Sequence, residues 1–264
     1  WNGLMESFTF NSSLILNEKK YGSHYFQTQN FEIGLFFHSY ADRSSDDTLF
    51  IFEKDNSLLI GVADGAGGHP RGADASFAIA SSIQKDFNKD SNFDLVRSLQ
   101  AANQAVLDLK CGARSTLNFA LIENESYYNL NVGDSELIHW NTKKRCIFKS
   151  TPQTTPGLLF KAEEIDSEEN LEHPLRSQVY HLLGDTNLTC ESSIITDLKQ
   201  GHGLLIASDG IHDNYTAEDL IEAFSGPEFE MQFVNFCGHL AHQLDAESLR
   251  SMDDCSLIVL RKKS

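Results

Sequence analysis

Segments with the composition of β-strands run through most of this 264-residue chain, and two pairs of helical segments interrupt them. The helical pairs are predicted at 73–87 with 95–109 and at 216–224 with 229–244, because apolar residues recur there at intervals of three and four. The predicted strands are short and divided by polar breaks: 8–16, 31–38, 49–52, 58–63, 116–122, 127–132, 136–140, 146–149, 179–183, 193–197, 204–207 and 256–260. This order favours an α+β fold, a central antiparallel β-sandwich flanked by helix pairs, over a doubly wound parallel sheet.

The chain is expected to form a single domain over residues 1–264. Hydrophobic residues make up 41% of it, which is enough for a core, and no Pro/Ser/Gly-rich linker or fixed-period repeat divides it. Residues 1–4 precede Met5 and are interpreted as a remnant of cloning. The stretch 151–178 combines three prolines with an acidic run, which indicates an exposed and mobile excursion from the core.

The chain is strongly acidic, with a net charge of -17 from 38 acidic and 21 basic residues. Nucleic-acid binding is therefore not expected, because it needs clusters of Lys and Arg that displace the counterions of the phosphate backbone. Such acidity suits solubility in general, and it also suits carboxylate ligation of divalent cations. Composition alone leaves both explanations open.

The five cysteines are widely spaced and form no Cys-x-x-Cys pair, so neither a zinc knuckle nor a disulfide framework is expected. This cysteine usage favours a reducing, cytoplasmic location. No apolar run approaches the ~20 residues of a membrane-spanning helix, and no signal peptide is recognised. We therefore expect no membrane partner.

Two apolar strands end in the same way. Residues 60–63 lead into Asp64-Gly65, and residues 204–207 lead into Ser208-Asp209-Gly210. A strand that delivers an aspartate to its end and then turns on glycine aims the carboxylate at a fixed point and leaves a backbone carbonyl open to a ligand. Asp-Gly is also the commonest turn pair, so either element alone could be only a turn.

Further acidic positions border apolar strands, namely Asp46-Asp47, Gly133-Asp134 and Asp253-Asp254. Adjacent like charges are costly unless solvent or a cation neutralises them. Only one member of each adjacent aspartate pair can point inward from an extended strand, and the register favours Asp253 over Asp254. Asp46 and Asp47 fit either metal ligation or a solvated loop.

The order of these motifs resembles that of the type 2C metal-dependent protein phosphatases (the PPM family) over most of the chain. The segments that carry the resemblance are Asp64-Gly65-Ala66-Gly67-Gly68, Arg114-Ser115-Thr116, Val132-Gly133-Asp134-Ser135, Leu183-Gly184-Asp185, Ala207–Asp213 and Asp253–Ser256. One such motif is a weak signal, whereas six in the family's order are specific. Ala66 stands where animal members carry histidine, so the chain looks like a divergent bacterial-type member.

The resemblance implies an oxygen-ligand site for two or three Mg²⁺ or Mn²⁺ ions, with Asp64 bridging two of them. The implied ligands are carboxylates and one carbonyl at strand ends: Asp46, Asp47, Asp64, Gly65, Asp134, Asp209, Asp213 and Asp253. Asp134 and Asp213 read equally well as caps of turns or helices. Asp64, Asp209 and Arg43 are the residues expected to act in catalysis.

The phosphate-binding arginine of the family has no exact counterpart in this chain. The family's arginine lies four residues before an acidic or amide residue followed by Asp, whereas Arg43 lies three residues before Asp46. Arg114 replaces the glycine of the Gly-Ser-Thr segment. Either guanidinium could hold a phosphate through a bidentate contact.

The function implied by the resemblance is hydrolysis of phosphoserine and phosphothreonine in proteins by a metal-activated water. A monomer with a phosphoprotein substrate is expected, and the stretch 151–178 would be the family's variable flap beside the site. One alternative is an inactive scaffold of the same fold that binds a protein partner. A second is another two-metal hydrolase such as a nuclease, which the charge of -17 counts against.

Overall fold

The computed structural model describes residues 10–17, 22–40, 45–89 and 93–263. Arg43 and the first part of the predicted strand 8–16 lie outside these ranges. Within them, no helix is long and apolar enough to cross a membrane.

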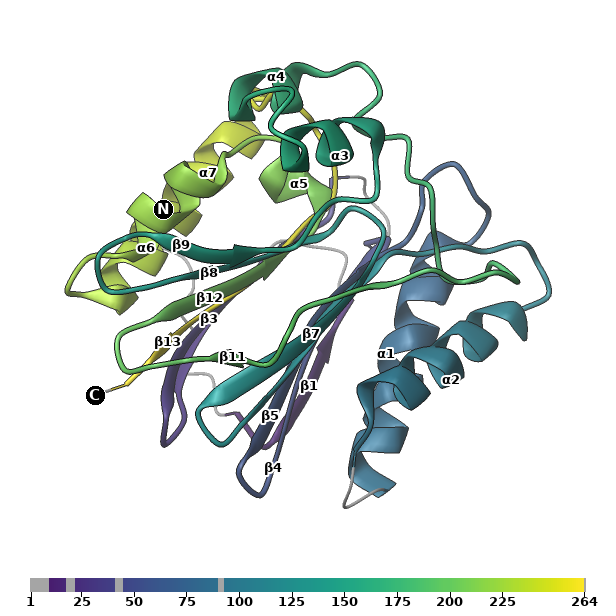
Figure 1. The fold of residues 1–264 in the computed structure, drawn as a ribbon, viewed down its shortest axis with the longest axis horizontal. Coiled ribbons are helices and arrows are strands. Elements are labelled where there is room, and N and C mark those ends of the chain that lie inside the picture. Colours follow the sequence, from purple (N-terminus) through teal and green to yellow (C-terminus); the bar gives the residue numbers. More distant parts are fainter. Residues whose placement is uncertain (1–9, 18–21, 41–44, 90–92, 264) are drawn as a thin grey trace.

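Two antiparallel sheets pack face to face in the described part of the chain (Figure 1). The first has seven strands in the order β1 (Ser13–Leu16), β4 (Asp47–Lys54), β5 (Ser57–Asp64), β6 (Leu117–Glu123) and β7 (Ser126–Val132), with β10 (Glu191–Ser192) and β11 (Thr196–Asp197) both paired to β7. The second has six, in the order β2 (Gly22–Gln27), β3 (Phe31–His38), β13 (Cys255–Lys262), β12 (Gly203–Ala207), β8 (Glu136–Trp140) and β9 (Cys146–Lys149).

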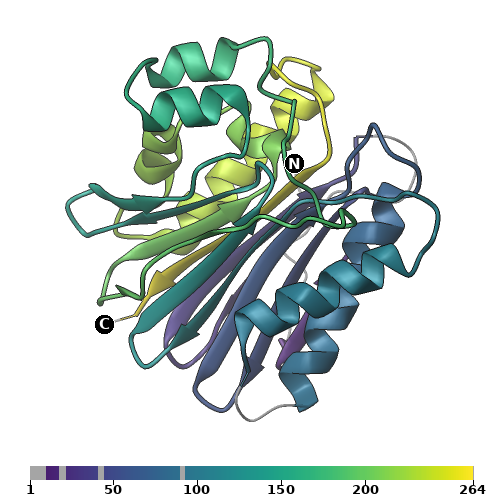
Figure 2. The ribbon, with the colours of Figure 1, turned by 45° about the vertical axis from the view of Figure 1, so that its right-hand side comes forward.

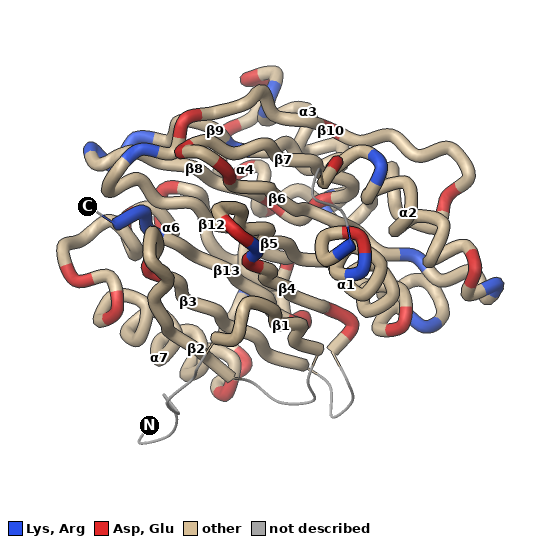
Figure 3. The backbone as a smooth tube through the Cα atoms, turned by 90° about the horizontal axis from the view of Figure 1, so that it is seen from below, with Lys and Arg blue, Asp and Glu red and all other residues tan. Residues whose placement is uncertain are grey.

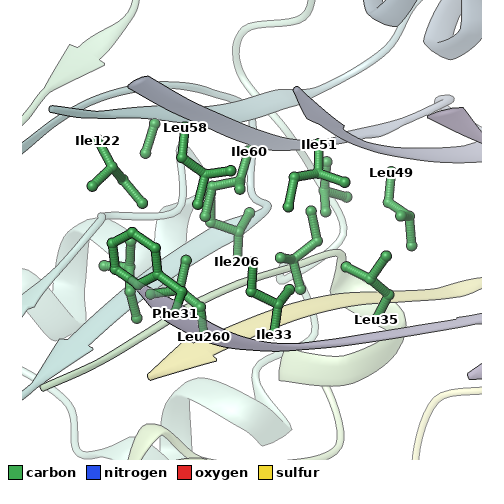
Figure 4. Close-up of a cluster of buried hydrophobic side chains, with 14 of the residues drawn as sticks. Phe31, Ile33, Leu35, Leu49, Ile51, Leu58, Ile60, Ile122, Ile206 and Leu260 are labelled. Carbon is green, nitrogen blue, oxygen red and sulfur yellow. The ribbon is translucent and has the colours of Figure 1, made fainter. Parts of the chain in front are cut away.

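The space between the two sheets is filled by aliphatic side chains from alternate strand positions. Figure 4 shows Ile51 and Ile60 of the first sheet facing Ile33 and Ile206 of the second. All four are fully buried, and each such side chain contributes about 1.5–3 kcal/mol of transfer free energy. This apolar interior fixes the register of the strands, because a slip by one residue would turn these side chains outward.

Helices cover both outer faces of the sandwich, as Figure 2 shows. The helices α1 (Gly72–Lys89) and α2 (Leu95–Leu107) pack on the seven-stranded sheet. The helices α6 (Ala217–Phe224) and α7 (Phe229–Asp245), with the short α5 (Asp209–His212), pack on the other sheet. The predicted α+β fold with an antiparallel sandwich between helix pairs is confirmed.

The stretch 151–178 contains regular structure that was not predicted from its composition. It contains α3 (Thr155–Lys161) and α4 (Ser167–Glu172), which lie near α5 (Figures 1 and 2). Pro156 falls in the first turn of α3, where no backbone N–H is needed. Asp166 and Glu169 form a capping box on α4. Two residues of the acidic run therefore start a helix, and the run is exposed as expected.

The strand predicted at 179–183 is wrong. Apart from one bridge between Leu183 and Ser115, these residues pair with no strand. The Tyr180 amide donates instead to the Gln153 carbonyl at 2.9 Å. Val179 and Leu182 are apolar because they line a cavity and not because they belong to a sheet.

Of the strand predicted at 193–197, only β11 is present, and β10 lies just before this stretch. Ser193 is buried, whereas Ile194 and Ile195 are exposed. No strand was predicted at β2, because its first residues are glycine and polar side chains. The Gly22 position is set by its partner strand, since a Cβ there would lie 2.5 Å from the Phe37 ring. Long-range packing of this kind leaves no local signal in the sequence.

Candidate metal centre

Aspartates from both sheets gather at one end of the sandwich. β5 ends at Asp64, and β4 begins at Asp47 directly opposite it in register. β7 leads into Asp134, β12 leads into Asp209, and Asp253 lies two residues before the start of β13. Because neighbouring strands are antiparallel, the end of one and the start of the next meet at the same edge. The topology therefore brings together residues that are up to about 200 positions apart in the sequence.

A cavity of about 600 Å³ opens at this end of the molecule. Its lining includes five carboxylates, those of Asp46, Asp64, Asp134, Asp209 and Asp253. Among the described residues, no Lys or Arg lines it. So many carboxylates around one space repel each other strongly unless a cation lies between them.

The pKa values of several of these carboxyl groups are raised, mainly by burial. Burial raises the pKa of Asp64 well above its usual value, and the charges of Asp47 and Asp134 raise it further. Burial likewise raises the pKa of Asp209, with Asp64 the largest charged contributor. Burial also raises the pKa of Asp134 to about 6. A divalent cation among these groups would lower the pKa values again, because it favours the charged form of each carboxyl.

Gly65 lies where two segments of backbone touch. A Cβ on Gly65 would lie 2.3 Å from the backbone carbon of Gly72, at the start of α1. The Gly65 amide donates to the Asp46 carbonyl at 3.0 Å, and the Asp46 carboxylate accepts from the Ala73 amide at 3.0 Å. The first turn of α1 therefore fixes the Asp46 carboxylate beside the glycine turn, and the peptide of Gly65 lines the cavity.

Asp46 and Asp47 lie in different environments. Asp46 lines the cavity, whereas Asp47 is buried behind it and is not part of the lining. The Asp47 carboxylate accepts a hydrogen bond of 2.6 Å from the Ser208 hydroxyl. The structure thus brings Asp46, and not Asp47, to the cavity surface.

The pair Asp253 and Asp254 is divided in the same way. Asp253 lines the cavity. The Asp254 carboxylate is buried and accepts from the Tyr40 amide at 2.7 Å, the Asp46 amide at 2.6 Å and the Ser45 hydroxyl at 3.0 Å. Asp253 therefore faces the cavity as the register suggested, and Asp254 ties the segment that carries Asp46 to the start of β13.

Asp213 is not part of the cavity lining. Its carboxylate accepts from Nε of Arg176 at 2.7 Å, and its amide donates to the Asp209 carbonyl at the end of α5. Asp213 therefore caps a helix and anchors the chain that follows α4. The ion pair of Arg176 was not predicted from the sequence, because nothing in the acidic stretch around it indicates a partner 37 residues away.

Arg114 does not reach the cavity. Its Nε donates to the Asp185 carboxylate at 2.8 Å and its Nη1 to the Ala113 carbonyl at 2.9 Å. The Arg114 carbonyl accepts from the Ala66 amide at 3.0 Å, so this residue supports the glycine turn through its backbone. Of the two arginines expected to bind phosphate, Arg114 is engaged elsewhere, and Arg43 lies outside the described residues.

Thr116 is a further cavity residue that the sequence did not single out as functional. Its hydroxyl accepts from the Asp64 amide at 3.1 Å, and its amide donates to the Asp64 carbonyl at 2.7 Å. A second hydrogen bond of 2.8 Å joins its hydroxyl to that of Ser135. Thr116 therefore fixes the backbone of Asp64 on both sides.

The donor set suits a hard cation that keeps part of its water. Across the described ranges, no three His, Cys, Asp or Glu side chains converge closely enough to enclose an ion by themselves. These residues therefore form no closed structural zinc site. Mg²⁺ and Mn²⁺ accept one or two carboxylates with carbonyl and water oxygens, which fits dispersed aspartates around a roomy cavity.

Comparison with known proteins agrees with this geometry. The family model for protein phosphatase 2C matches residues 37–254, so the chain belongs to the protein phosphatase 2C family. A protein phosphatase 2C-type protein of Streptococcus pyogenes is 25% identical over 243 residues, which are 85% of this chain and 95% of that protein. The resemblance seen in the order of the motifs is confirmed.

Solved structures show the same fold. Serine/threonine phosphatase Stp1 from Staphylococcus aureus superposes with a TM-score of 0.74 at 19% identity, covering 100% of both chains. The catalytic domain of the serine/threonine phosphatase PstP, in complex with two manganese ions, superposes with a TM-score of 0.69 at 19% identity. It covers 89% of this chain and 99% of its own.

Proposed function

We propose that this protein is a metal-dependent phosphatase that hydrolyses phosphoserine and phosphothreonine in proteins. The observation that carries the proposal is the cavity with five carboxylates and no Lys or Arg in its described lining. The membership of the protein phosphatase 2C family and the two manganese ions of PstP support it. A monomer acting in the cytoplasm remains our prediction.

The residues that would hold two ions follow from the lining. Asp64, Asp209, Asp253 and Asp46, with the Gly65 carbonyl, are the oxygen donors that would hold them. When bound, Mg²⁺ or Mn²⁺ would supply an acidified water and offset charge on the phosphoryl oxygens.

The protein's own part is to fix these oxygens and to exclude other charges. Thr116 and the first turn of α1 hold Asp64 and Asp46 in place before any ion binds, so little reorganisation is needed during the reaction. Asp47 and Asp254 support them from behind and are not proposed as ligands. Asp134 lines the cavity and is available to a third ion, whereas Asp213 is engaged by Arg176. Arg43 stays a prediction for phosphate binding.

The test is hydrolysis of a phosphothreonine peptide with Mn²⁺ or Mg²⁺, with EDTA, and by the Asp209→Asn variant. Turnover that needs the metal and is abolished by the substitution would support the proposal. Asp185→Asn is a matched control, because Asp185 lies outside the cavity lining and pairs with Arg114. A folded protein that binds Mn²⁺ without turning over the peptide would contradict the proposal.

That last outcome would favour the second candidate, a phosphatase-fold scaffold that binds a protein partner. The observation in its favour is that Arg114 is tied to Asp185 and does not offer its guanidinium to the cavity. A nuclease is not supported, because no described Lys or Arg lines the cavity and, in the view of Figure 3, Lys and Arg lie in short separate stretches.

A further inference from the structure

Two adjacent glycines, Gly67 and Gly68, line the carboxylate cavity although the fold does not require glycine there. Both are exposed, and the φ angle of neither lies in the left-handed range. A Cβ added to either residue would meet no heavy atom within 4 Å. Any ordinary side chain could therefore begin at these positions in the free protein.

Nearly every other glycine in the described part has a structural reason. Each either has a positive φ or would place a Cβ under 3.0 Å from a neighbouring atom, with Gly238 of α7 as the exception. Gly65, at the start of the same turn, is of this second kind. The turn that carries Asp64 thus contains one glycine required by packing and two that packing does not explain.

Glycine without a packing reason lowers stability, because the unfolded chain gains conformational freedom. What glycine offers in return is a backbone that another backbone can approach closely. The turn is held in place, since the Ala66 amide donates to the Arg114 carbonyl and the His69 amide to the Ala66 carbonyl, both at 3.0 Å. Gly67 and Gly68 therefore present a fixed, bare stretch of main chain to the cavity.

Ser177, Gln178, Val179 and Leu182 also line this cavity, and they come from the chain that follows α4. All four are uncharged, and Ser177 and Gln178 are exposed. Because none of these residues or of the two glycines carries a charge, they would recognise a ligand by shape and hydrogen bonds. That chemistry suits a polypeptide in an extended form.

We infer that Gly67 and Gly68 determine substrate class by leaving room for the main chain of a phosphorylated polypeptide, whose phosphate then reaches the carboxylates. The inference rests on the proposed phosphatase function and deepens it. It predicts that side chains at these two positions discriminate against peptides more than against small phosphomonoesters, which carry no flanking main chain.

The experiment compares Gly67→Ala, Gly67→Val, Gly68→Ala and Gly68→Val with the unchanged protein in Mn²⁺. Two probes are used, a phosphothreonine peptide and p-nitrophenyl phosphate. The measured quantity is the ratio of kcat/KM for the peptide to kcat/KM for p-nitrophenyl phosphate. We expect this ratio to fall by about ten-fold or more in the valine variants and by less in the alanine variants. Gly238→Ala is the matched control, because its Cβ also meets nothing, and its ratio should stay unchanged.

An unchanged ratio in all four variants would overturn the inference and leave the proposed function standing. A parallel loss of both activities together with Mn²⁺ binding would also overturn it, because the glycines would then serve only the metal turn. No turnover of either probe by the unchanged protein would refute the proposed function and the inference with it. If the valine variants unfold at the assay temperature, the alanine variants decide the question, since their Cβ atoms meet no neighbour.

Discussion

His139 makes the stability of this protein depend on pH through a group far from the carboxylate cavity. It lies in the middle of β8, is 0% exposed, and faces the interior of the sandwich. Its Nε2 shares a hydrogen bond of 2.9 Å with Nδ1 of His202, and its Nδ1 lies 3.4 Å from the Tyr127 hydroxyl. Burial, and then the His202 charge, lower the pKa of His139 from 6.5 to about 4. The folded protein therefore holds this imidazole neutral.

The sign of the effect follows from proton linkage. Because the pKa of His139 is lower in the folded state, the unfolded chain binds the proton more readily between pH 6.5 and about 4. Above pH 6.5 neither state is protonated and nothing is lost. As the pH falls through this window, the free energy of unfolding decreases, by about 2 kcal/mol at pH 5 and by about 3 kcal/mol once the folded pKa is passed.

The assay is urea denaturation at pH 7.5 and at pH 5 for the unchanged protein, His139→Gln and His239→Gln. The glutamine at 139 lowers stability at both pH values but removes the titration, so its pH-dependent loss should be smaller by about 2 kcal/mol. His239 is exposed on α7, so its variant should lose as much as the unchanged protein. An equal loss in His139→Gln and the unchanged protein would refute the reasoning.

Two further predictions concern the supports of the cavity. Asp254→Asn places an NH₂ group against one of the backbone amides or the hydroxyl that now donate to the carboxylate. We expect the free energy of unfolding in urea to fall by about 2 kcal/mol. Unchanged stability would contradict this role. Arg176→Ala removes the ion pair with Asp213 that anchors residues 177–182 beside the cavity, where the two side chains are 28% and 12% exposed. It should raise KM for a phosphothreonine peptide while changing the free energy of unfolding by less than about 1 kcal/mol. Arg176→Lys is the control that keeps the charge, and an unchanged KM in Arg176→Ala would count against the anchor.

Much of the fold could be predicted because its signals are local. The strands β3, β8 and β9 begin and end where hydrophobic pattern and polar breaks placed them, and both helix pairs are present. The predictions failed where a side chain contacts residues that are distant in the sequence. Val179 and Leu182 have the composition of a strand, yet their apolar surface belongs to a cavity wall. Nothing in a single segment distinguishes these two uses of the same residue types.

Part of the carboxylate site could be predicted from the sequence for a related reason. Asp64 and Asp209 share a local signature, an apolar strand followed by a glycine turn, and both line the cavity. Which of Asp46 and Asp47 faces the cavity could not be predicted, because it depends on the first turn of α1 and on Ser208, both distant in sequence. The role of Arg176 could not be predicted for the same reason. The position of a residue can be predicted from the sequence where its own strand determines it. It cannot be predicted where contacts with a distant segment determine it.

The paired aspartates explain how so much negative charge is held together before a cation arrives. In each pair one carboxylate faces the cavity and the other accepts hydrogen bonds from a neighbouring segment. Asp254 accepts from the amide of Asp46, Asp47 accepts from the Ser208 hydroxyl, and that hydroxyl in turn accepts from the Ser256 amide. The segments that carry Asp46, Asp209 and Asp253 are therefore joined by hydrogen bonds through Asp47 and Asp254. Hydrogen bonds to charged acceptors contribute about 1.5–3 kcal/mol each, which offsets repulsion among the carboxylates that face the cavity. Replacing a cavity aspartate should thus weaken metal binding and relieve repulsion, whereas replacing a supporting aspartate should loosen the loops themselves.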